Sequence, residues 1–458
     1  MAGLASMPLA SRAASQLSGP AFTPEMFGAK GDGQTNDTEA FAAMSARVNA
    51  AGGGTIVLRP TTYVVGRQRR GPERDGVAFA PLDIIRLVNC RHPIVINGNG
   101  ARLRAAPGLL YGRFDPGAGK PMADPDKLQL THRGVPYFGM IFIENCSGSV
   151  DIRDVELDGN LQGLRAGGKS AKGGWQAAGT GIRLMGNSGA ERIERVRTHH
   201  HPQDGLMLNA SPTRSATTTL IDVISDSNGR QGCSITGGRN YSFQRCKFTR
   251  TGRAGLSGAP GAGVDIEAES SPIRNVSFSD CEFSDNHGFG LVSGMGDSAD
   301  IVAENCRFIG TTNLAAWPES PRMRFSNCVF VGSLNHLYGS PDPSRAAQFL
   351  DCTFTDDPSL SPTGQVYLQG GSWIAVARPG PNVRFARCHF RLVGEAMLPL
   401  TASNVIYEDC DMSQRSGRQS APLGTYFGTN SITGNATLQG SNIRGSVRLN
   451  GRELPRNG

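Results

Sequence analysis

The segment QDGLMLN at residues 203–209 recurs along the chain as a short motif aligned on its glycine. Four further copies read GTGIRLM, RQGCSIT, AGVDIEA and GFGLVSG, with the aligned glycine at 181, 232, 263 and 290. The first and third residues after each glycine are almost all apolar, which is the period of a β-strand with one buried face. Successive glycines are 24, 27, 31 and 27 residues apart, so one short supersecondary unit repeats along the chain.

A second strand follows each glycine strand after 14 to 18 residues. A cysteine two residues before a phenylalanine recurs six times along the chain, at Cys246, Cys281, Cys306, Cys328, Cys352 and Cys388, and the first three of these lie in such second strands. The pattern lacks both the leucine-rich signature and the 40–45-residue period of a propeller blade. It predicts an all-β fold made of a single parallel β-helix, a solenoid in which like residues form ladders. With no CxxC spacing, the ten cysteines are interpreted as buried core thiols.

The N-terminal part of the chain predicts a cap for the solenoid. Asn36 or Asp37 begins an expected amphipathic helix that runs to about Asn49, and a strand follows GGG at 55–58. We therefore expect a flexible leader or signal remnant at 1–20, a cap with a helix at 21–66, and the β-helix at 67–458. Its last ~20 residues are expected to be less regular, since terminal repeats are atypical.

This entry segment also carries a family resemblance. FGAKGDGQTNDTEAF followed by GGGTIVLRPTTYVV resembles the entry motif of the pectate-lyase-like β-helix superfamily, in particular its rhamnogalacturonase/epimerase-like and polygalacturonase-type members. The resemblance implies a right-handed parallel β-helix that acts on polysaccharide. The motif itself is a structural cap and does not identify the reaction.

Composition restricts the partners. The net charge of +7 over 458 residues is modest and the basic residues are scattered, which argues against nucleic-acid binding. No apolar run is long enough to span a bilayer. The small-residue start, MAGLASMPLASRAASQ, resembles the end of an export signal and favours a secreted or periplasmic location. The oligomeric state cannot be inferred from these features.

Two carboxylates in the fourth copy are the strongest candidates for catalysis. Asp265 and Glu267 alternate with Val264 and Ile266, so they share the outer face of a strand about 6.6 Å apart at the backbone. Glycoside hydrolysis uses such a pair, and both known carboxylate separations remain open here. Asp204, directly before a glycine, is a third catalytic candidate. It resembles the first carboxylate of polygalacturonases, whose paired aspartates are replaced here by Arg230 and Gln231 and whose Gly-His-Gly is missing.

The remaining polar residues near these carboxylates predict sugar binding. They comprise Arg230, Gln231, Arg183, Asn209 and His201 around the glycine strands, together with Trp175 in one of two long insertions, 159–179 and 249–261. The insertions are expected to border a groove. Trp175 either stacks on a sugar ring or packs against its own loop.

Two other chemistries use the same residues. A lyase or epimerase would clamp a uronate carboxylate with Arg230 and Gln231 and take a proton with Lys172 or one of His199, His200 and His201. We expect no required cofactor or metal, with calcium held by Asp204, Asp265 and Glu267 as the alternative. The three histidines do not predict a transition-metal site, because consecutive residues on an extended turn cannot all face one ion.

The sequence thus predicts a carbohydrate-active enzyme that cleaves glycosidic bonds of an extended, acidic polysaccharide. Asp265 and Glu267 would form its acid/base pair. The alternatives are a uronate lyase or epimerase, and a non-catalytic glycan-binding β-helix.

Overall fold

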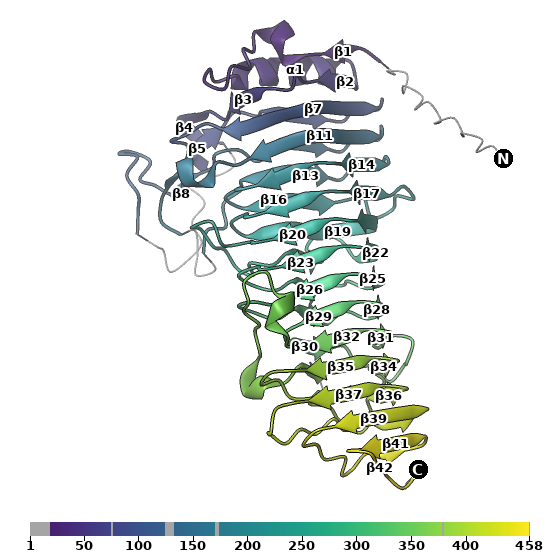
Figure 1. The fold of residues 1–458 in the computed structure, drawn as a ribbon. Coiled ribbons are helices and arrows are strands. Elements are labelled where there is room, and N and C mark those ends of the chain that lie inside the picture. The colour runs from purple at the N-terminus through teal and green to yellow at the C-terminus, as the bar shows by residue number, and fades with distance from the viewer. Residues whose placement is uncertain (1–18, 75–76, 124–131, 170–173, 378–379, 458) are drawn as a thin grey trace, which may run out of the picture.

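The computed structural model describes residues 19–74, 77–123, 132–169, 174–377 and 380–457, and its coils stack along one axis (Figure 1). Three runs of parallel strands form three faces of the solenoid. The first face carries the glycine strands, and consists of β6 (Ile85–Val88), β10 (Gly139–Glu144), β13 (Thr180–Met185), β16 (Asp204–Asn209), the start of β19 (Gln231–Gln244), β21 (Val264–Glu267), β24 (Leu291–Met295), β27 (Ala316–Pro318), β30 (Leu334–Leu337) and β33 (Ala375–Ala377).

The other two faces carry the strands that follow in each coil. The second face consists of β1 (Ala21–Phe22), β2 (Gly54–Val57), the starts of β7 (Ile94–Ala105) and β11 (Val150–Asp158), β14 (Glu191–Glu194), β17 (Thr218–Ile221), the end of β19, β22 (Ile273–Ser279), β25 (Ile301–Glu304), β28 (Met323–Ser326), β31 (Gln348–Leu350), β34 (Arg384–Ala386), β36 (Ile406–Glu408), β38 (Thr425–Phe427) and β40 (Asn442–Ile443). The third face consists of β3 (Thr62–Val65), the ends of β7 and β11, β15 (Arg197–His199), β18 (Ile224–Asp226), β20 (Lys247–Thr249), β23 (Glu282–Ser284), β26 (Arg307–Ile309), β29 (Val329–Val331), β32 (Thr353–Thr355), β35 (His389–Leu392), β37 (Asp411–Gln414), β39 (Thr429–Thr433) and β41 (Ser446–Leu449).

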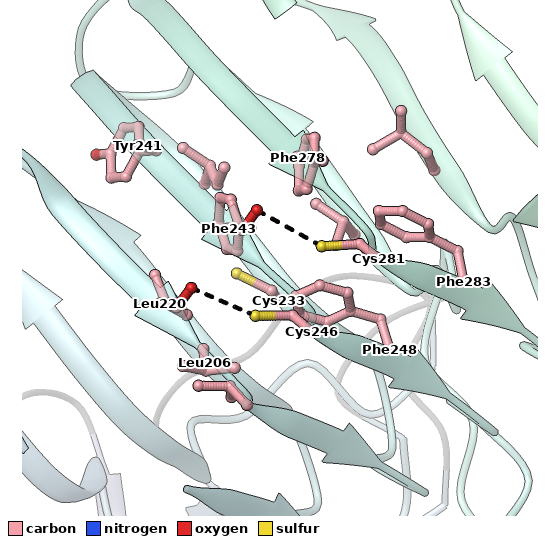
Figure 2. Close-up of a cluster of buried hydrophobic side chains, with 14 of the residues drawn as sticks. Leu206, Leu220, Cys233, Tyr241, Phe243, Cys246, Phe248, Phe278, Cys281 and Phe283 are labelled. Atoms are coloured by element: carbon pink, nitrogen blue, oxygen red, sulfur yellow. Dashed lines mark hydrogen bonds between the residues drawn. The ribbon is translucent and has the colours of Figure 1, made fainter. Parts of the chain in front are cut away.

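The core consists of ladders of like side chains, as the repeat predicted. Figure 2 shows Phe243 stacked on Phe278, with ring centroids 4.6 Å apart, and Phe248 on Phe283, at 5.5 Å. The Cys246 thiol donates to the carbonyl of Leu220. All ten cysteines are free and buried, which confirms their interpretation as core thiols. The ladders place apolar area from every coil in one continuous core.

The register of the glycine strands is confirmed, apart from two bulges. The pairings of Leu206 with Cys233 and of Ser234 with Asp265 are as expected. At the strand ends the register shifts, so Asn209 pairs with Gly237 and Glu267 with Met295, one residue later than the constant spacing predicted. A bulge adds one residue to one strand. Counting a constant number of residues from each aligned glycine cannot detect it.

Both ends of the solenoid are covered. Helix α1 (Thr38–Ala50) buries one face, including Phe41, Met44 and Val48, against the first coils. The Asp37 carboxylate accepts from the amides of Lys30 and Gly31, which fixes the preceding turn. At the other end β41 pairs antiparallel with β42 (Arg452–Glu453). Short 3₁₀ turns occur at Pro24–Phe27, Leu161–Gly163, Pro358–Leu360 and Gly370–Ser372.

A separate small sheet lies beside the first coils and was not predicted (Figure 1). It consists of β4 (Gln68–Arg74), β5 (Val77–Pro81), β8 (Leu110–Arg113), β9 (Arg133–Gly134) and β12 (Arg165–Ala166). Its strands come from insertions between coils, where the repeat pattern is interrupted. It contributes a wall near the first face. Among the described residues, no helix is long and apolar enough to cross a membrane.

Candidate functional site

The aligned glycine of the first face occupies a position that faces the interior of the solenoid. A Cβ at Gly205 would lie 2.0 Å from Ser225 Oγ and 2.6 Å from Asn228 Nδ2, so this position faces the interior. The residue before the glycine and the residue two after it then both point outward. The Asp204 carboxylate accordingly accepts a hydrogen bond of 3.0 Å from Ser234 Oγ of the next coil.

The two predicted carboxylates lie together at one cavity of the first face. Asp265 and Glu267 line a cavity of about 340 Å³ with Phe289, Trp317 and Glu319. Asp265 is only 6% exposed, whereas Glu267 is half-buried. The loop at Ala259 and Pro260 covers one side of the cavity. The pair therefore lies in a partly closed cavity. The sequence had suggested an open strand surface instead.

Burial changes the acidity of Asp265. Loss of solvation, followed by the negative charge of Glu267, raises its pKa to about 7 from an ordinary value of 3.8. Arg230 opposes this shift by favouring the carboxylate, and Asp204 adds to it. A carboxyl group that holds its proton near neutral pH is suited to act as a general acid.

A network of buried polar groups contacts the Asp265 carboxyl group on its protein side. Gln231 donates to Asp265 Oδ2 at 2.8 Å and accepts from the amide of Ala262 at 2.9 Å. Arg230 donates to both oxygens of Asp204, each at 2.8 Å. Gln231 and Asp204 have no exposed surface. The structure thus places Asp204, expected to be catalytic, and Gln231, expected to bind sugar, beneath the surface, where they contact Arg230 and Asp265.

The same contacts exclude two of the expected roles. Arg230 is paired with Asp204, so with Gln231 also engaged it does not form the expected clamp for a substrate carboxylate. Both Asp204 oxygens are taken by Arg230 and Ser234, so the calcium set with Asp265 and Glu267 does not form. Asn209, another expected sugar-binding residue, donates to the hydroxyls of Thr236 and Ser270 at the bulge between β16 and β19. Lys172, the other expected base, lies outside the described residues.

Arg183 keeps a partly exposed position on the first face. Its guanidinium carbon lies 5.0 Å from the centroid of the Phe142 ring, and Arg86 stacks on the same ring at 5.2 Å. Burial lowers the pKa of Arg183, opposed by the charges of Glu144 and Asp204. Within the described part of the chain, its Nε has no hydrogen-bond partner. Arg183 thus keeps a partly exposed cationic side chain on the first face.

Two expected sugar-binding residues lie elsewhere. His201 is fully buried, and Tyr137 Oη lies 2.9 Å from its Nδ1. Its position four residues before the glycine is an interior corner shared with Asn228 and Asn286, so the prediction for His201 is wrong. Burial lowers the pKa of His201 to about 3. Trp175 packs in its own insertion, where Nε1 donates to the Gly167 carbonyl at 3.1 Å.

The two insertions meet, as expected for the border of a groove. Gly174 forms a bridge with Gly258, and Gln176 donates to the carbonyl of Ala259 at 3.0 Å. Arg230 in turn donates to Gln176 Oε1 at 3.2 Å. This contact joins the insertions to the polar network beneath Asp265.

Trp317 and Glu319 also line the cavity, and neither was predicted from the sequence. Trp317 continues the outward column of Asp265 and Val292, and its Nε1 donates to Glu319 Oε2 at 2.7 Å. The Trp317 ring stacks on His336 with centroids 4.0 Å apart. Alanine replaces the aligned glycine in this coil, so the motif did not reveal the column. The Trp317 ring adds an apolar surface to the cavity beside the carboxylates.

The acidity of Asp265 predicts a pH-dependent stability. Between about pH 4 and 7 the folded chain holds a proton that the unfolded chain has lost, so stability decreases as pH rises through 7. Asp265→Asn removes the buried charge. We expect this variant to be more stable than the wild type at about pH 8, by up to roughly 4 kcal/mol, and equally stable near pH 4. Urea unfolding at both pH values tests this, and equal stability at the higher pH would contradict the raised pKa.

Comparisons with known proteins support the fold. Residues 139–330 match the family described as right handed beta helix region. The N-terminal fragment of gene product 12 of bacteriophage Phi29 has a TM-score of 0.57 at 13% identity, covering 94% of this chain and 72% of that one. The A-module of the Azotobacter vinelandii mannuronan C-5 epimerase AlgE4 has a TM-score of 0.48 at 15% identity, covering 95% and 100%. The expected right-handed β-helix is confirmed.

One curated protein matches a short segment closely. A capsule KN3-specific depolymerase of Klebsiella phage KN3-1 is 57% identical over 44 residues. This segment is 9% of the present chain and 6% of the depolymerase, so the match covers a small part of either protein.

Proposed function

We propose that this chain is an enzyme that cleaves glycosidic bonds in an extended, acidic polysaccharide. The observation that carries the proposal is the cavity with Asp265 and Glu267, in which burial holds the proton of Asp265 near neutral pH. The short match to a capsule depolymerase supports a polysaccharide as the substrate class. In this function Asp265 protonates the leaving oxygen, and Glu267 acts as the second carboxylate.

The surroundings of the pair fit a sugar polymer. Phe289 and Trp317 line the cavity in an edge-to-face arrangement, with centroids 5.3 Å apart, and offer an apolar surface to one sugar ring. Arg183 lies on the same outward column as Asp265, three coils away, and supplies positive charge for an acidic sugar. The stacked coils place these groups along a line, which suits an extended chain.

A screen of acidic polysaccharides with the full chain tests the proposal. We expect new reducing ends without the ultraviolet absorbance of an unsaturated uronate. Absorbance at the wavelength of that double bond would instead identify β-elimination, and an altered uronate configuration with intact polymer would identify epimerisation. Polymer binding without any product would overturn the catalytic proposal in favour of a glycan-binding β-helix.

A further inference from the structure

The third face carries a cluster of metal-ligand type that is separate from the carboxylate cavity. Asp158 at the end of β11 and His199 at the end of β15 are paired neighbours in adjacent coils, and His200 follows directly. One ligand atom from each of the three residues lies within 4.8 Å of the other two. The residues border a cavity of about 180 Å³. Asp158 and His199 are buried and His200 is half-buried, so the cluster opens to solvent on one side.

A left-handed turn brings the two adjacent histidines to one point. His200 has φ 54°, whereas an extended chain would direct neighbouring side chains to opposite faces. The two rings lie at 87° to each other with centroids 5.0 Å apart, and their Nδ1 atoms are 2.7 Å apart. His201 lies inside the core, so the three consecutive histidines do not face one point. Asp158 takes the third position instead.

The contact of His199 with Glu156 directs the Nδ1 lone pair of His199 toward the cluster. Its Nε2 lies 2.8 Å from Glu156 Oε1, and a carboxylate can only accept, so Nε2 carries a proton. The Nδ1 of neutral His199 is then an acceptor that faces His200. Carboxylate–histidine contacts of this kind orient metal ligands and fix their tautomer.

The charges around the cluster narrow the choice of ion. Arg102 donates to Asp158 Oδ2, and Arg104 Nε lies 3.7 Å from the same oxygen. Arg197 lies 3.9 Å from Glu156. The oxygen of Asp158 that remains available to bind an ion is therefore Oδ1. This oxygen also accepts a hydrogen bond from the amide of Asn160. Calcium and magnesium need several oxygen ligands, whereas zinc and related transition metals bind imidazole nitrogen.

We propose that Asp158, His199 and His200 bind a divalent transition-metal ion, with zinc as the best fit. The ion replaces the hydrogen bond between the two Nδ1 atoms, and the Nδ1 proton of His200 is transferred through solvent to its Nε2, so that both imidazoles bind as neutral ligands. Zinc–nitrogen bonds of about 2.0–2.1 Å require these nitrogens to move apart by less than about 1 Å. Three protein ligands leave a fourth position for water on the open side. The ion would join two neighbouring coils on a face away from Asp265.

Metal analysis of the full chain, purified without a histidine tag, tests this site. After treatment with chelator and dialysis against zinc, we expect one bound ion per chain by mass spectrometry. His200→Ala should lose the ion, and Glu156→Gln should weaken binding by about 10- to 100-fold in calorimetry. His287→Ala is the matched control, because His287 is an exposed histidine at the same kind of corner, and should retain the ion.

Two further measurements separate a loss of metal binding from a loss of folding. Thermal unfolding in chelator shows whether His200→Ala folds, and the visible spectrum of the cobalt-loaded wild type reports nitrogen ligation without any variant. Asp265→Asn should bind zinc like the wild type, so this site and the proposed catalytic function can fail independently. No stoichiometric zinc in the wild type, or equal zinc in His200→Ala and His287→Ala, would overturn the proposal.

Discussion

Asp265→Asn is expected to lower the rate of polysaccharide cleavage by about 100- to 10,000-fold, the usual contribution of a positioned general acid. Asparagine fills the same volume beside Gln231 but cannot transfer a proton to the leaving oxygen. Because Asp265 is already surrounded by protein, the neutral side chain should not disturb the fold. The measurement is the initial rate of reducing-end formation on the polymer identified by the screen, together with polymer binding.

Two further variants test whether the loss of activity is specific to the carboxylates of the cavity. Glu267→Gln should reduce the rate by a similar factor, because it removes the second carboxylate. Glu304→Gln is the control, since Glu304 is an exposed strand carboxylate on the second face, and it should retain the wild-type rate. If Asp265→Asn stayed within a few-fold of the wild type, the pair would not be the catalytic site.

The pH dependence of the rate follows from the same group. The acid must be protonated to act, so activity should decrease as pH rises above about 7. The descending limb of the pH–rate profile reports the pKa of Asp265 in the working enzyme.

The regular part of the fold could be predicted because it depends on local alternation. Val264 and Ile266 face the core, so Asp265 and Glu267 had to share the outer side, and the register of β21 follows. The depth of Asp265 could not be predicted in this way. It depends on the loop at Ala259 and Pro260, whose position is set by contacts with a distant insertion and not by the repeat.

The mistaken residues show where alternation fails. His201 lies in an interior corner four residues before Gly205, whereas Asp204 points outward as expected but is covered by Arg230. Trp317 was missed because its coil replaces the glycine that served as the marker. The turn at His200 is left-handed, and this conformation is not encoded by any glycine or asparagine at the position.

Arg230→Met is expected to destabilise the fold by about 3–5 kcal/mol, the largest stability effect at the site. The substitution leaves the Asp204 carboxylate charged with no exposed surface, and Ser234 alone cannot replace two charged hydrogen bonds. The comparison of urea unfolding midpoints, at an unchanged denaturant slope, measures the loss. Arg245→Met is the matched control, because Arg245 makes the same two-bond contact with Asp222 at the surface and should cost less than about 1 kcal/mol.

A second substitution separates the charge from the packing. Asp204→Asn in the Arg230→Met background removes the unpaired charge and should recover most of the lost stability, because no buried ion remains. In the single variant the pKa of Asp265 should rise further, since the favourable charge of Arg230 is gone while Asp204 remains. The descending limb of the pH–rate profile should then move to higher pH in Arg230→Met and return toward its original position in the double variant. An unchanged limb in both would show that the Arg230–Asp204 pair supports the fold without tuning the acid.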